Sequence, residues 1–240
     1  DKFMQRNFGT EKIEEQLQET FPEAKVARMD IDTVRGKNAH DVLIQQFEQK
    51  RIDILVGTQM VVKGLDFDNV DLVGILDADG LLHFADFRVN ERAFQLMEQV
   101  SGRAGRKKEQ GKVLIQAMQV QHPVLALLLK HDYDGFYQYE IENRKNFFYP
   151  PFSRMVSLML KHKDKQLVED AAHRLAASLR MDFRDYIVGP AAPVVARLRN
   201  QYLQEIILKL PKETGMGKRY KQSIRNHINL LNSESKFKSV

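Results

Sequence analysis

The 240-residue sequence contains no cysteine, which excludes disulfide bonds and thiolate-ligated metal sites within these residues. It has no run of eighteen uncharged apolar residues, so we expect no transmembrane helix and no membrane partner. The chain starts at Asp1 without an initiating Met or a signal-peptide pattern, and we therefore expect a segment of a longer protein. Hydrophobic residues make up 43% of the sequence, which is typical of a soluble globular protein with real cores.

The positive charge of the chain is concentrated near its C-terminus. The formal net charge is +5, and residues 211–240 carry seven Lys or Arg against two Glu, so the remainder of the chain is neutral. Such a segment is a plausible surface for a phosphate backbone. An ordinary solvated basic face is an equally good interpretation of the same pattern.

Strand and helix patterns alternate over the first half of the sequence. The predicted helices cover residues 10–21, 38–50 and 87–103, and the predicted strands cover residues 25–29, 52–56, 72–76 and 113–117. We expect Thr10 to cap the first helix. Alternation of this kind predicts an α/β domain with a parallel sheet over residues 1–120, in which ligands gather beyond the carboxyl ends of the strands.

The second half of the sequence has a different pattern. Residues 121–151 form a helical and aromatic connector, and residues 152–240 form a smaller α+β domain. Asp164 is expected to cap a helix, and the strands are expected at residues 155–161, 186–188, 203–210 and 237–240. A second helix is expected at residues 217–231. The resulting β-α-β-β-α-β order is that of a ferredoxin-like domain.

Two groups of side chains allow more than one interpretation. Asp30 and Asp32 follow a predicted strand and could hold a metal ion, but loop carboxylates more often form turns, and we favour the turn. The aromatic residues of the connector lie close to Arg144 and Lys145 and could stack on bases. We favour a packing role for them, because aromatic side chains are more often buried anchors.

Residues 99–106, with the sequence QVSGRAGR, carry the strongest chemical signal. Gln99 and Arg103 are four residues apart and share one face of a helix. Gly102 and Gly105 let the backbone approach a ligand. Two guanidinium groups with a glutamine beside them suit a triphosphate, because arginine binds phosphate oxygens in a planar, bidentate manner. The octet matches Q-x-x-G-R-x-G-R and resembles motif VI of superfamily 2 helicases.

Residues 57–67, with the sequence GTQMVVKGLDF, resemble helicase motif V. Thr58 offers a hydroxyl and a backbone N–H at a strand end, Gly64 permits close approach, and Asp66 could accept a ribose hydroxyl. On its own this would be an ordinary strand-to-loop turn. The spacing to residues 99–106 makes the pair of motifs specific.

The resemblance extends beyond the superfamily and covers nearly the whole chain. The segments that carry it are residues 28–33, 54–60, 76–80, 85–88 and 91–92, together with Pro150-Pro151 and Gly189-Pro190. They resemble the primosomal protein N′ (PriA) family of replication-restart DNA helicases. The resemblance implies that the chain is the second RecA-like helicase lobe followed by the C-terminal domain. Family members often carry an arginine at the position of Leu203, which puts a DNA contact of that strand in doubt.

The family resemblance also implies the roles of individual residues. Arg103, Arg106 and Gln99 would act on the transferring γ-phosphoryl group of ATP, while Gly64 and Asp66 would contact the nucleotide. The implied DNA contacts are Thr58, Gln59, Lys63, Arg199, Lys218, Arg219, Lys221 and Arg225. No G-x-x-x-x-G-K-[ST] sequence and no Asp-Glu-x-His box is present, so ATP and Mg²⁺ would be held mainly by a first lobe outside this chain. Zinc would belong to a cysteine-rich insert of the full-length protein, and this chain would hold no metal.

The implied function is ATP-dependent 3′–5′ unwinding of DNA during replication restart and primosome assembly at stalled forks, in the bacterial cytoplasm near the nucleoid. The implied partners are single-stranded and forked DNA, single-strand DNA-binding protein, other primosome proteins and the loader of the replicative helicase. The isolated chain is expected to be inactive. The alternatives are a non-catalytic module that binds nucleic acid or protein, and a lobe of another superfamily 2 helicase that acts on RNA.

Overall fold

The computed structural model describes residues 9–30, 39–58, 70–84, 86–102, 104 and 111–240 of the chain. The chain divides into two units, Asp1–Phe136 and Tyr137–Val240. The boundary falls inside one helix, α7 (Tyr133–Asn146). The division into residues 1–120, 121–151 and 152–240 stays a prediction.

The first unit alternates strands and helices, as the sequence predicts. Its elements are α1 (Thr10–Thr20), β1 (Val26–Met29), α2 (Ala39–Glu48), β2 (Ile54–Gly57), β3 (Leu72–Ile75), α4 (Ala78–Leu82), α5 (Val89–Ser101), β4 (Lys112–Ile115) and α6 (Pro123–Leu129). The predicted cap of α1 is wrong by one position. Gly9 is the N-cap, and the Thr10 hydroxyl instead donates to Asp30 Oδ2 at 2.7 Å.

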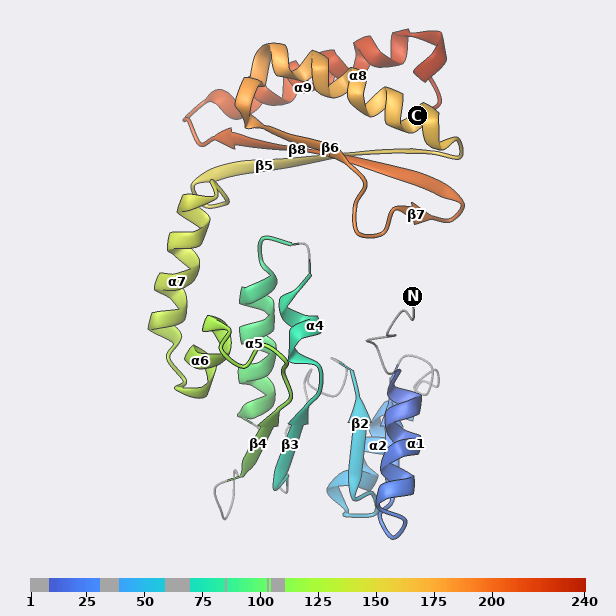
Figure 1. Cartoon of the computed structure of the whole chain (residues 1–240), viewed down its shortest axis with the longest axis vertical. Coiled ribbons are helices and arrows are strands. Elements are labelled where there is room, and N and C mark those ends of the chain that lie inside the picture. Colours follow the sequence, from blue (N-terminus) through green and yellow to red (C-terminus); the bar gives the residue numbers. More distant parts are fainter. Residues whose placement is uncertain (1–8, 31–38, 59–69, 85, 103, 105–110) are drawn as a thin grey trace. The chain divides into compact units, whose positions relative to one another are not determined.

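The described strands of this unit form two parallel pairs, and Figure 1 shows both in the lower part of the view. β1 pairs with β2 so that Met29 lies opposite Gly57, and β3 pairs with β4 so that Ile75 lies opposite Ile115. Met29 is completely buried, and its neighbours include Phe47 of α2. The parallel pairing is confirmed, and each pair brings the carboxyl ends of its two strands to one edge.

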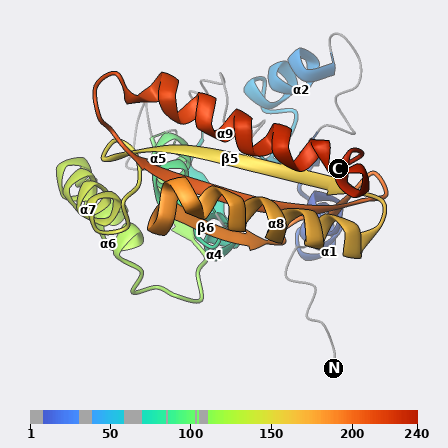
Figure 2. The ribbon, with the colours of Figure 1, turned by 90° about the horizontal axis from the view of Figure 1, so that it is seen from above.

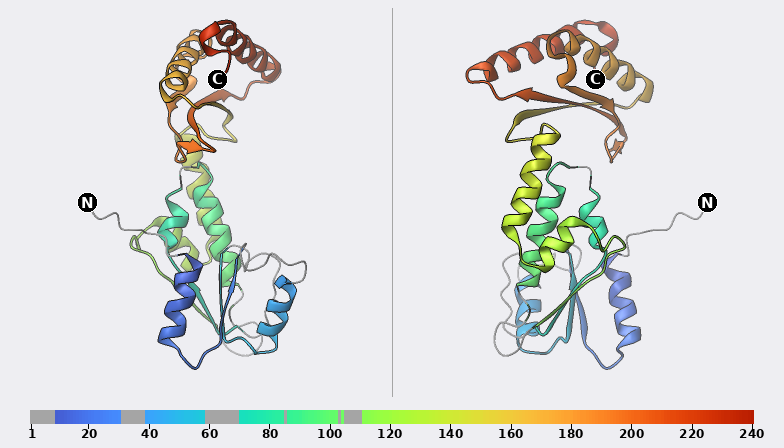
Figure 3. Two further views of the ribbon diagram at one scale, coloured as in Figure 1. Left: turned by 90° about the vertical axis from the view of Figure 1, so that its right-hand side faces the viewer. Right: turned by 60° about the vertical axis from the view of Figure 1, so that its left-hand side comes forward.

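The second unit is an antiparallel sheet covered by two long helices. It consists of β5 (Ser153–His162), α8 (Lys165–Phe183), η1 (Arg184–Tyr186), β6 (Ile187–Ala191), β7 (Arg197–Leu198), β8 (Gln201–Pro211), α9 (Met216–Ser233) and η2 (Ser235–Phe237). The strand order is β5-β8-β6, and β7 forms a hairpin with β8. Both helices lie on the same side of the sheet in Figures 1 and 3, and Figure 2 shows them side by side.

The core of the second unit lies between this sheet and its helices. Asp164 caps α8 by accepting a hydrogen bond from the Leu167 N–H at 3.1 Å, as the sequence predicts. The inward positions predicted for α8 are all buried: Val168, Ala171, Ala172, Leu175 and Leu179. They pack with the central β8 residues Ile206, Leu208 and Leu210 in one apolar cluster.

The strand predicted at residues 237–240 is wrong. Phe237 ends η2, and the N–H groups of Phe237 and Val240 donate to the carbonyl groups of Glu234 and Phe237 in consecutive turns. The phenyl group of Phe237 is only 5% exposed and packs in the core of the second unit. The burial of this ring and the turns around it outweigh the strand propensity of the segment. Because the last strand of the β-α-β-β-α-β order is therefore absent from residues 237–240, the ferredoxin-like order is not confirmed.

The connector residues pack locally, in line with the favoured interpretation. Phe136 is buried and stacks on Phe94 with a centroid distance of 4.1 Å and an interplanar angle of 10°. Phe147 is 62% exposed, so base stacking stays an open interpretation for that ring. None of the helices in the described part of the chain is long and apolar enough to span a membrane.

A polar chain links α8 to α9. His227 lies between the Ser178 hydroxyl, 2.6 Å from Nδ1, and Asp182 Oδ2, 3.0 Å from Nε2. Ser223 donates a hydrogen bond to the same carboxylate. The hydroxyl of Ser223, followed by His227, lowers the pKa of Asp182 below its usual value. The folded state therefore favours the ionised carboxylate.

We expect the Asp182→Asn variant to lose part of the acid sensitivity of the protein. Because the pKa of Asp182 is lowered on folding, its stabilising contribution is complete above the unfolded value of about 3.9 and disappears as the pH falls through the folded value. Melting temperatures measured between about pH 6 and 2.5 should therefore fall less steeply for Asp182→Asn than for the wild type below about pH 4. Identical slopes for the two proteins would contradict this role.

Candidate nucleotide and DNA site

Thr58 lies where the sequence places it, at the carboxyl end of a parallel strand. It follows β2 directly and is exposed. The register of β1 and β2 puts Asp30, the residue after β1, at the same edge. The strand end therefore presents a hydroxyl and a backbone N–H to ligands at the edge where α/β sheets bind them.

Asp30 is occupied by contacts within the protein. Its side chain accepts a hydrogen bond from Thr10 and forms an ion pair with Arg28, whose Nη1 is 3.1 Å from Oδ2. These contacts connect the turn after β1 to α1. They support the interpretation of Asp30 as a turn-forming carboxylate rather than as a metal ligand. Asp32 lies outside the described residues. Within the described ranges, no group of three His, Asp or Glu side chains is arranged to hold a metal ion.

Gln99 lies in the last turn of α5 and is exposed. Gln95 and Arg92, four and seven residues earlier, are also exposed, so the three form one polar stripe along the helix. The helix ends at Ser101, two residues earlier than predicted, because Gly102 leaves the helix while its N–H still donates to the Glu98 carbonyl at 3.0 Å. In the sequence, the stripe is followed directly by residues 102–106, which contain the two glycine-arginine pairs.

Six predicted site residues lie outside the described residues. They are Gln59, Lys63, Gly64, Asp66, Arg103 and Arg106. Their roles stay predictions, and the structure bears on them only through the elements that precede them.

The opposite side of α5 is anchored within its unit. Ala93, Phe94 and Met97 are buried. Near the C-terminal end, the Glu98 carboxylate contacts His131 Nδ1 at 2.8 Å, which joins α5 to the turn after α6. The exposed stripe is therefore carried by a helix whose rotation is fixed by packing and by a polar contact.

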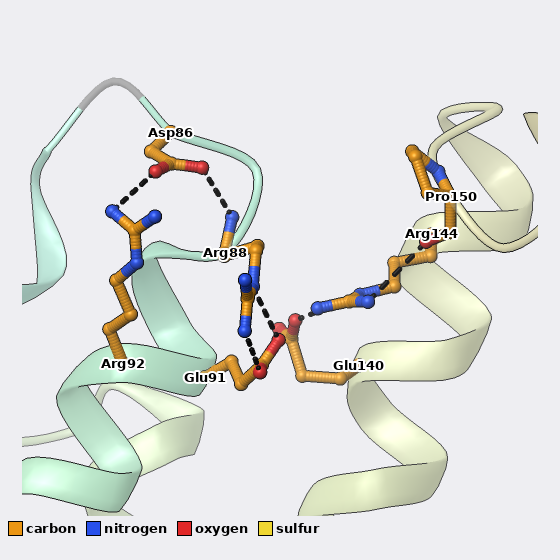
Figure 4. Close-up of polar contacts among 7 residues, drawn as sticks. All are labelled: Asp86, Arg88, Glu91, Arg92, Glu140, Arg144 and Pro150. Atoms are coloured by element: carbon orange, nitrogen blue, oxygen red, sulfur yellow. Dashed lines mark hydrogen bonds and ion pairs between the residues drawn. The ribbon is translucent and has the colours of Figure 1, made fainter. Parts of the chain in front are cut away.

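Two ion pairs hold the loop that enters α5 (Figure 4). Asp86 Oδ2 lies 2.5 Å from Arg92 Nη1, and Asp86 Oδ1 accepts the backbone N–H of Arg88 at 3.0 Å. Arg88 donates two hydrogen bonds to the Glu91 carboxylate, at 3.2 and 2.7 Å, and this pairing raises the pKa of the Arg88 guanidinium. These residues belong to the segments that resemble the helicase family, but their contacts are not among the site predictions made from the sequence. The i,i+3 spacing of Arg88 and Glu91 was the one signal available.

Asp79 joins the carboxyl ends of the second strand pair. Its carboxylate accepts the N–H groups of Met118 at 2.6 Å and Gln119 at 3.1 Å, beyond the end of β4. These hydrogen bonds, that of Met118 first, lower the pKa of Asp79. The residue itself lies in α4, just after β3. It therefore holds the loop after β4 to the start of α4, at the edge where ligands are expected.

We expect Asp79→Ala to release the loop after β4. Without the carboxylate, the amides of Met118 and Gln119 lose their acceptor, and their hydrogen exchange should become at least several-fold faster. Exchange at the Gln116 amide, which donates to the Ile75 carbonyl at 2.8 Å, serves as an internal control and should change little. Unchanged exchange at Met118 and Gln119 would show that Asp79 does not hold this loop.

The structure gathers four of the C-terminal candidates and separates the fifth. Lys218, Lys221 and Arg225 are exposed on one face of α9 at i, i+3 and i+7 spacing, with Arg219 beside them. The inward face is the predicted one, because Ile224 and Leu231 are buried and Tyr220 and Ile228 pack against the core. Arg199 lies instead at the turn between β7 and β8. The α9 cluster, defined as Lys218, Arg219, Lys221 and Arg225, is thus a surface of its own.

Two cations contact the segment before β5 within the second unit, Arg144 of α7 and Lys209 of β8. Arg144 Nε lies 3.7 Å from the buried Glu140 carboxylate, and its Nη1 donates to the Pro150 carbonyl at 3.4 Å, as Figure 4 shows. Lys209 donates to the Phe147 carbonyl at 2.8 Å and places its ammonium group 3.7 Å from the ring centroid of Tyr149. These contacts favour packing over base stacking for Arg144 and Tyr149.

Comparison with known families divides the chain in a similar way. Residues 3–108 match the helicase conserved C-terminal domain, and residues 145–238 match the primosomal protein N C-terminal domain. The first match contains Thr58, Gln99 and the two glycine-arginine pairs, and the second contains the α9 cluster.

Individual relatives match across most of the chain. The replication restart protein PriA of Bacillus subtilis (strain 168) is 41% identical over 223 residues, which cover 91% of this chain and 28% of the relative. The PriA proteins of Synechocystis sp. and Treponema pallidum (strain Nichols) are each 40% identical over 205 residues, covering 85% of this chain and 25% and 31% of those relatives. The chain thus spans about a quarter to a third of the length of these curated relatives. The combination of both matched domains with these relatives shows that the chain belongs to the replication restart protein PriA family, as part of its C-terminal region.

Proposed function

We propose that the chain is the C-terminal part of an ATP-dependent 3′–5′ DNA helicase that acts in replication restart and primosome assembly at stalled forks. The observation that carries the proposal is the exposed Gln99 on a firmly anchored α5, which ends immediately before the segment with Arg103 and Arg106. Thr58 at the carboxyl end of β2 supports it.

In this proposal the catalytic machinery is divided between two lobes. The residues of this chain do not fit a complete ATP and Mg²⁺ site, since the described carboxylates form no metal-binding group and the sequence has no P-loop. ATP supplies the phosphoryl group whose transfer drives the motor, and a lobe outside this chain would hold its phosphates and Mg²⁺. Zinc would likewise belong to a cysteine-rich module elsewhere in the full-length protein.

The residues of this chain would act on charge and position. Arg103 and Arg106 would stabilise negative charge on the γ-phosphoryl oxygens, as arginine fingers do. Gln99 would hydrogen-bond a phosphate oxygen or the attacking water. Gly64 and Asp66 would contact the nucleotide.

The DNA contacts would lie on both units. Thr58, Gln59 and Lys63 would contact the DNA backbone at the helicase lobe, and Arg199 and the α9 cluster would add phosphate contacts in the C-terminal domain.

We also propose that the C-terminal domain is related to the ferredoxin-like fold. The elements β5-α8-β6-β8-α9 supply, in order, five of the six elements of that fold.

The proposed partners are single-stranded and forked DNA, single-strand DNA-binding protein, primosome proteins and the helicase loader. The proposed location is the bacterial cytoplasm at the nucleoid.

ATPase assays on a longer protein that includes the upstream lobe test this proposal. We expect forked DNA to stimulate hydrolysis and RNA of the same length to stimulate it weakly. The isolated 240-residue chain should show no turnover with either nucleic acid. Equal stimulation by RNA would favour an RNA helicase, and absence of turnover in the longer protein would favour a non-catalytic binding module.

A further inference from the structure

The corner between α6 and α7 has a backbone fixed by hydrogen bonds. His131 lies in this corner with a φ of 53°, in the left-handed region that His, Asn and Asp occupy more often than other non-glycine residues. Its N–H donates to the Leu128 carbonyl at 2.9 Å, and its carbonyl accepts the Tyr133 N–H at 3.2 Å. The next residue, Asp132, accepts the Gly135 N–H at 2.8 Å in the first turn of α7. These bonds fix the backbone from which the imidazole of His131 projects.

The imidazole of His131 contacts the last turn of α5. Its Nδ1 lies 2.8 Å from Glu98 Oε1, and because a carboxylate oxygen can only accept, we assign the proton to Nδ1. The other carboxylate oxygen, Oε2, is buried and has no hydrogen-bond partner among the described residues. A carboxylate that is short of partners is costly to deprive of another, because its desolvation is then uncompensated. The position of the Glu98 side chain therefore depends on His131.

An aromatic contact joins the same elements one turn earlier along α5. Phe94 stacks on Phe136 and lies 6.4 Å from the ring centroid of Tyr133, both of which belong to the first turns of α7. Phe94 and Glu98 are four residues apart and share one face of α5. The aromatic contact fixes the middle of α5, and the contact with His131 fixes its C-terminal turn.

The C-terminal turn of α5 is the part of the helix that the proposed chemistry uses. Gln99 follows Glu98 directly, and the Glu98 carbonyl accepts the Gly102 N–H at 3.0 Å, where the chain leaves the helix. Misplacement of a reacting group by about 1 Å can cost about 10²-fold in rate. The orientation of this turn is therefore worth fixing precisely.

We infer that His131 is a positioning residue for phosphoryl transfer. Through Glu98 it sets the orientation of Gln99 and the point at which the segment with Arg103 and Arg106 leaves α5. The inference rests on the proposed function, which gives Gln99 and the two arginines their roles. It adds the corner between α6 and α7, which no motif of the sequence marks, to the residues on which turnover depends.

Two substitutions separate the hydrogen bond of His131 from its backbone. His131→Asn keeps an N–H donor near the position of Nδ1, whereas His131→Gly removes the donor, and both new residues tolerate a positive φ. In a longer protein that includes the upstream lobe, His131→Gly should lower kcat for DNA-stimulated ATP hydrolysis about fivefold or more. His131→Asn should stay within about twofold of the wild type. KM for ATP should change little in either variant, because the upstream lobe would hold the bound nucleotide.

A double-mutant cycle with Glu98→Ala tests whether the two residues act through one contact. If they do, the double variant loses no more turnover than the more impaired single variant. Lys50→Gly is the matched control, since Lys50 is also exposed with a positive φ, 57°, but lies between α2 and β2. Its kcat should stay within about twofold of the wild type. Fully multiplicative losses in the double variant, or equal losses in His131→Gly and Lys50→Gly, would overturn the inference.

Hydrogen exchange in the 240-residue chain tests the contact without ATP. The Gly102 amide should exchange at least about threefold faster in His131→Gly than in the wild type, and His131→Asn should behave like the wild type. The Leu167 amide, which donates to Asp164 in the second unit, is the internal control and should not change. Unchanged exchange at Gly102 in His131→Gly would overturn the inference. Absence of turnover in the wild-type longer protein would instead count against the proposed function, so the two failures are distinguishable.

Discussion

Replacing Arg106 with alanine in a longer protein that includes the upstream P-loop lobe is expected to lower DNA-stimulated ATP hydrolysis by about 10³-fold or more. The reason is that arginine fingers contribute about 10³–10⁵ in rate by neutralising charge on the transferring phosphoryl group. DNA affinity should stay close to that of the wild type, because the proposed partner of Arg106 is the nucleotide. Steady-state ATPase rates and DNA-binding isotherms measured on the same preparations separate the two effects.

Arg51→Ala provides the control for this experiment. Arg51 is also exposed, but it lies before β2, away from the carboxyl ends of the strands where ligands gather. Its removal should leave turnover within about twofold of the wild type, since surface substitutions away from a site have small effects. Wild-type turnover in the Arg106→Ala protein would show that the assignment of the finger is wrong.

Truncating Leu208 to alanine is expected to have the largest effect on stability. Leu208 is completely buried on the central strand β8, in the cluster that also contains α8 and α9 residues. Removal of a fully buried leucine side chain costs about 2–5 kcal/mol, because the transfer free energy is lost and a cavity remains. Urea denaturation followed by far-UV circular dichroism should show the transition of the second unit at a lower urea concentration.

Leu198→Ala is the matched control, because it is the same substitution at an exposed hairpin position. It should change the free energy of unfolding by no more than about 0.5 kcal/mol. Equal destabilisation by both substitutions would contradict the packing described for β8.

The elements that sequence reasoning found are those with strong local signals. The apolar spacing of α8 and its Asp164 cap are both observed, and the inward face of α9 is as predicted. The missed elements depend on tertiary contacts. β7 is two residues long and exists by pairing with β8, and α4 has five residues. The bounds of α7 could not be predicted, because its aromatic and charged residues are not separated into an apolar and a polar face.

The candidate site shows the same division between local and long-range information. Thr58 and Gln99 occupy a strand end and a helix end, as their motifs predict. The role of Asp79 could not be predicted, since its partners Met118 and Gln119 are 39 and 40 residues away in sequence. The contact of Asp86 with Arg92 likewise depends on the fold of the loop before α5.

The most direct test of the account is a structure of the longer protein with DNA and a transition-state mimic of ATP, such as ADP with aluminium fluoride. The account predicts that the guanidinium groups of Arg103 and Arg106 reach the fluoride ligands at hydrogen-bond distance, about 3 Å, with Gln99 beside them. Both guanidinium groups bound within their own lobe, away from the nucleotide, would contradict it.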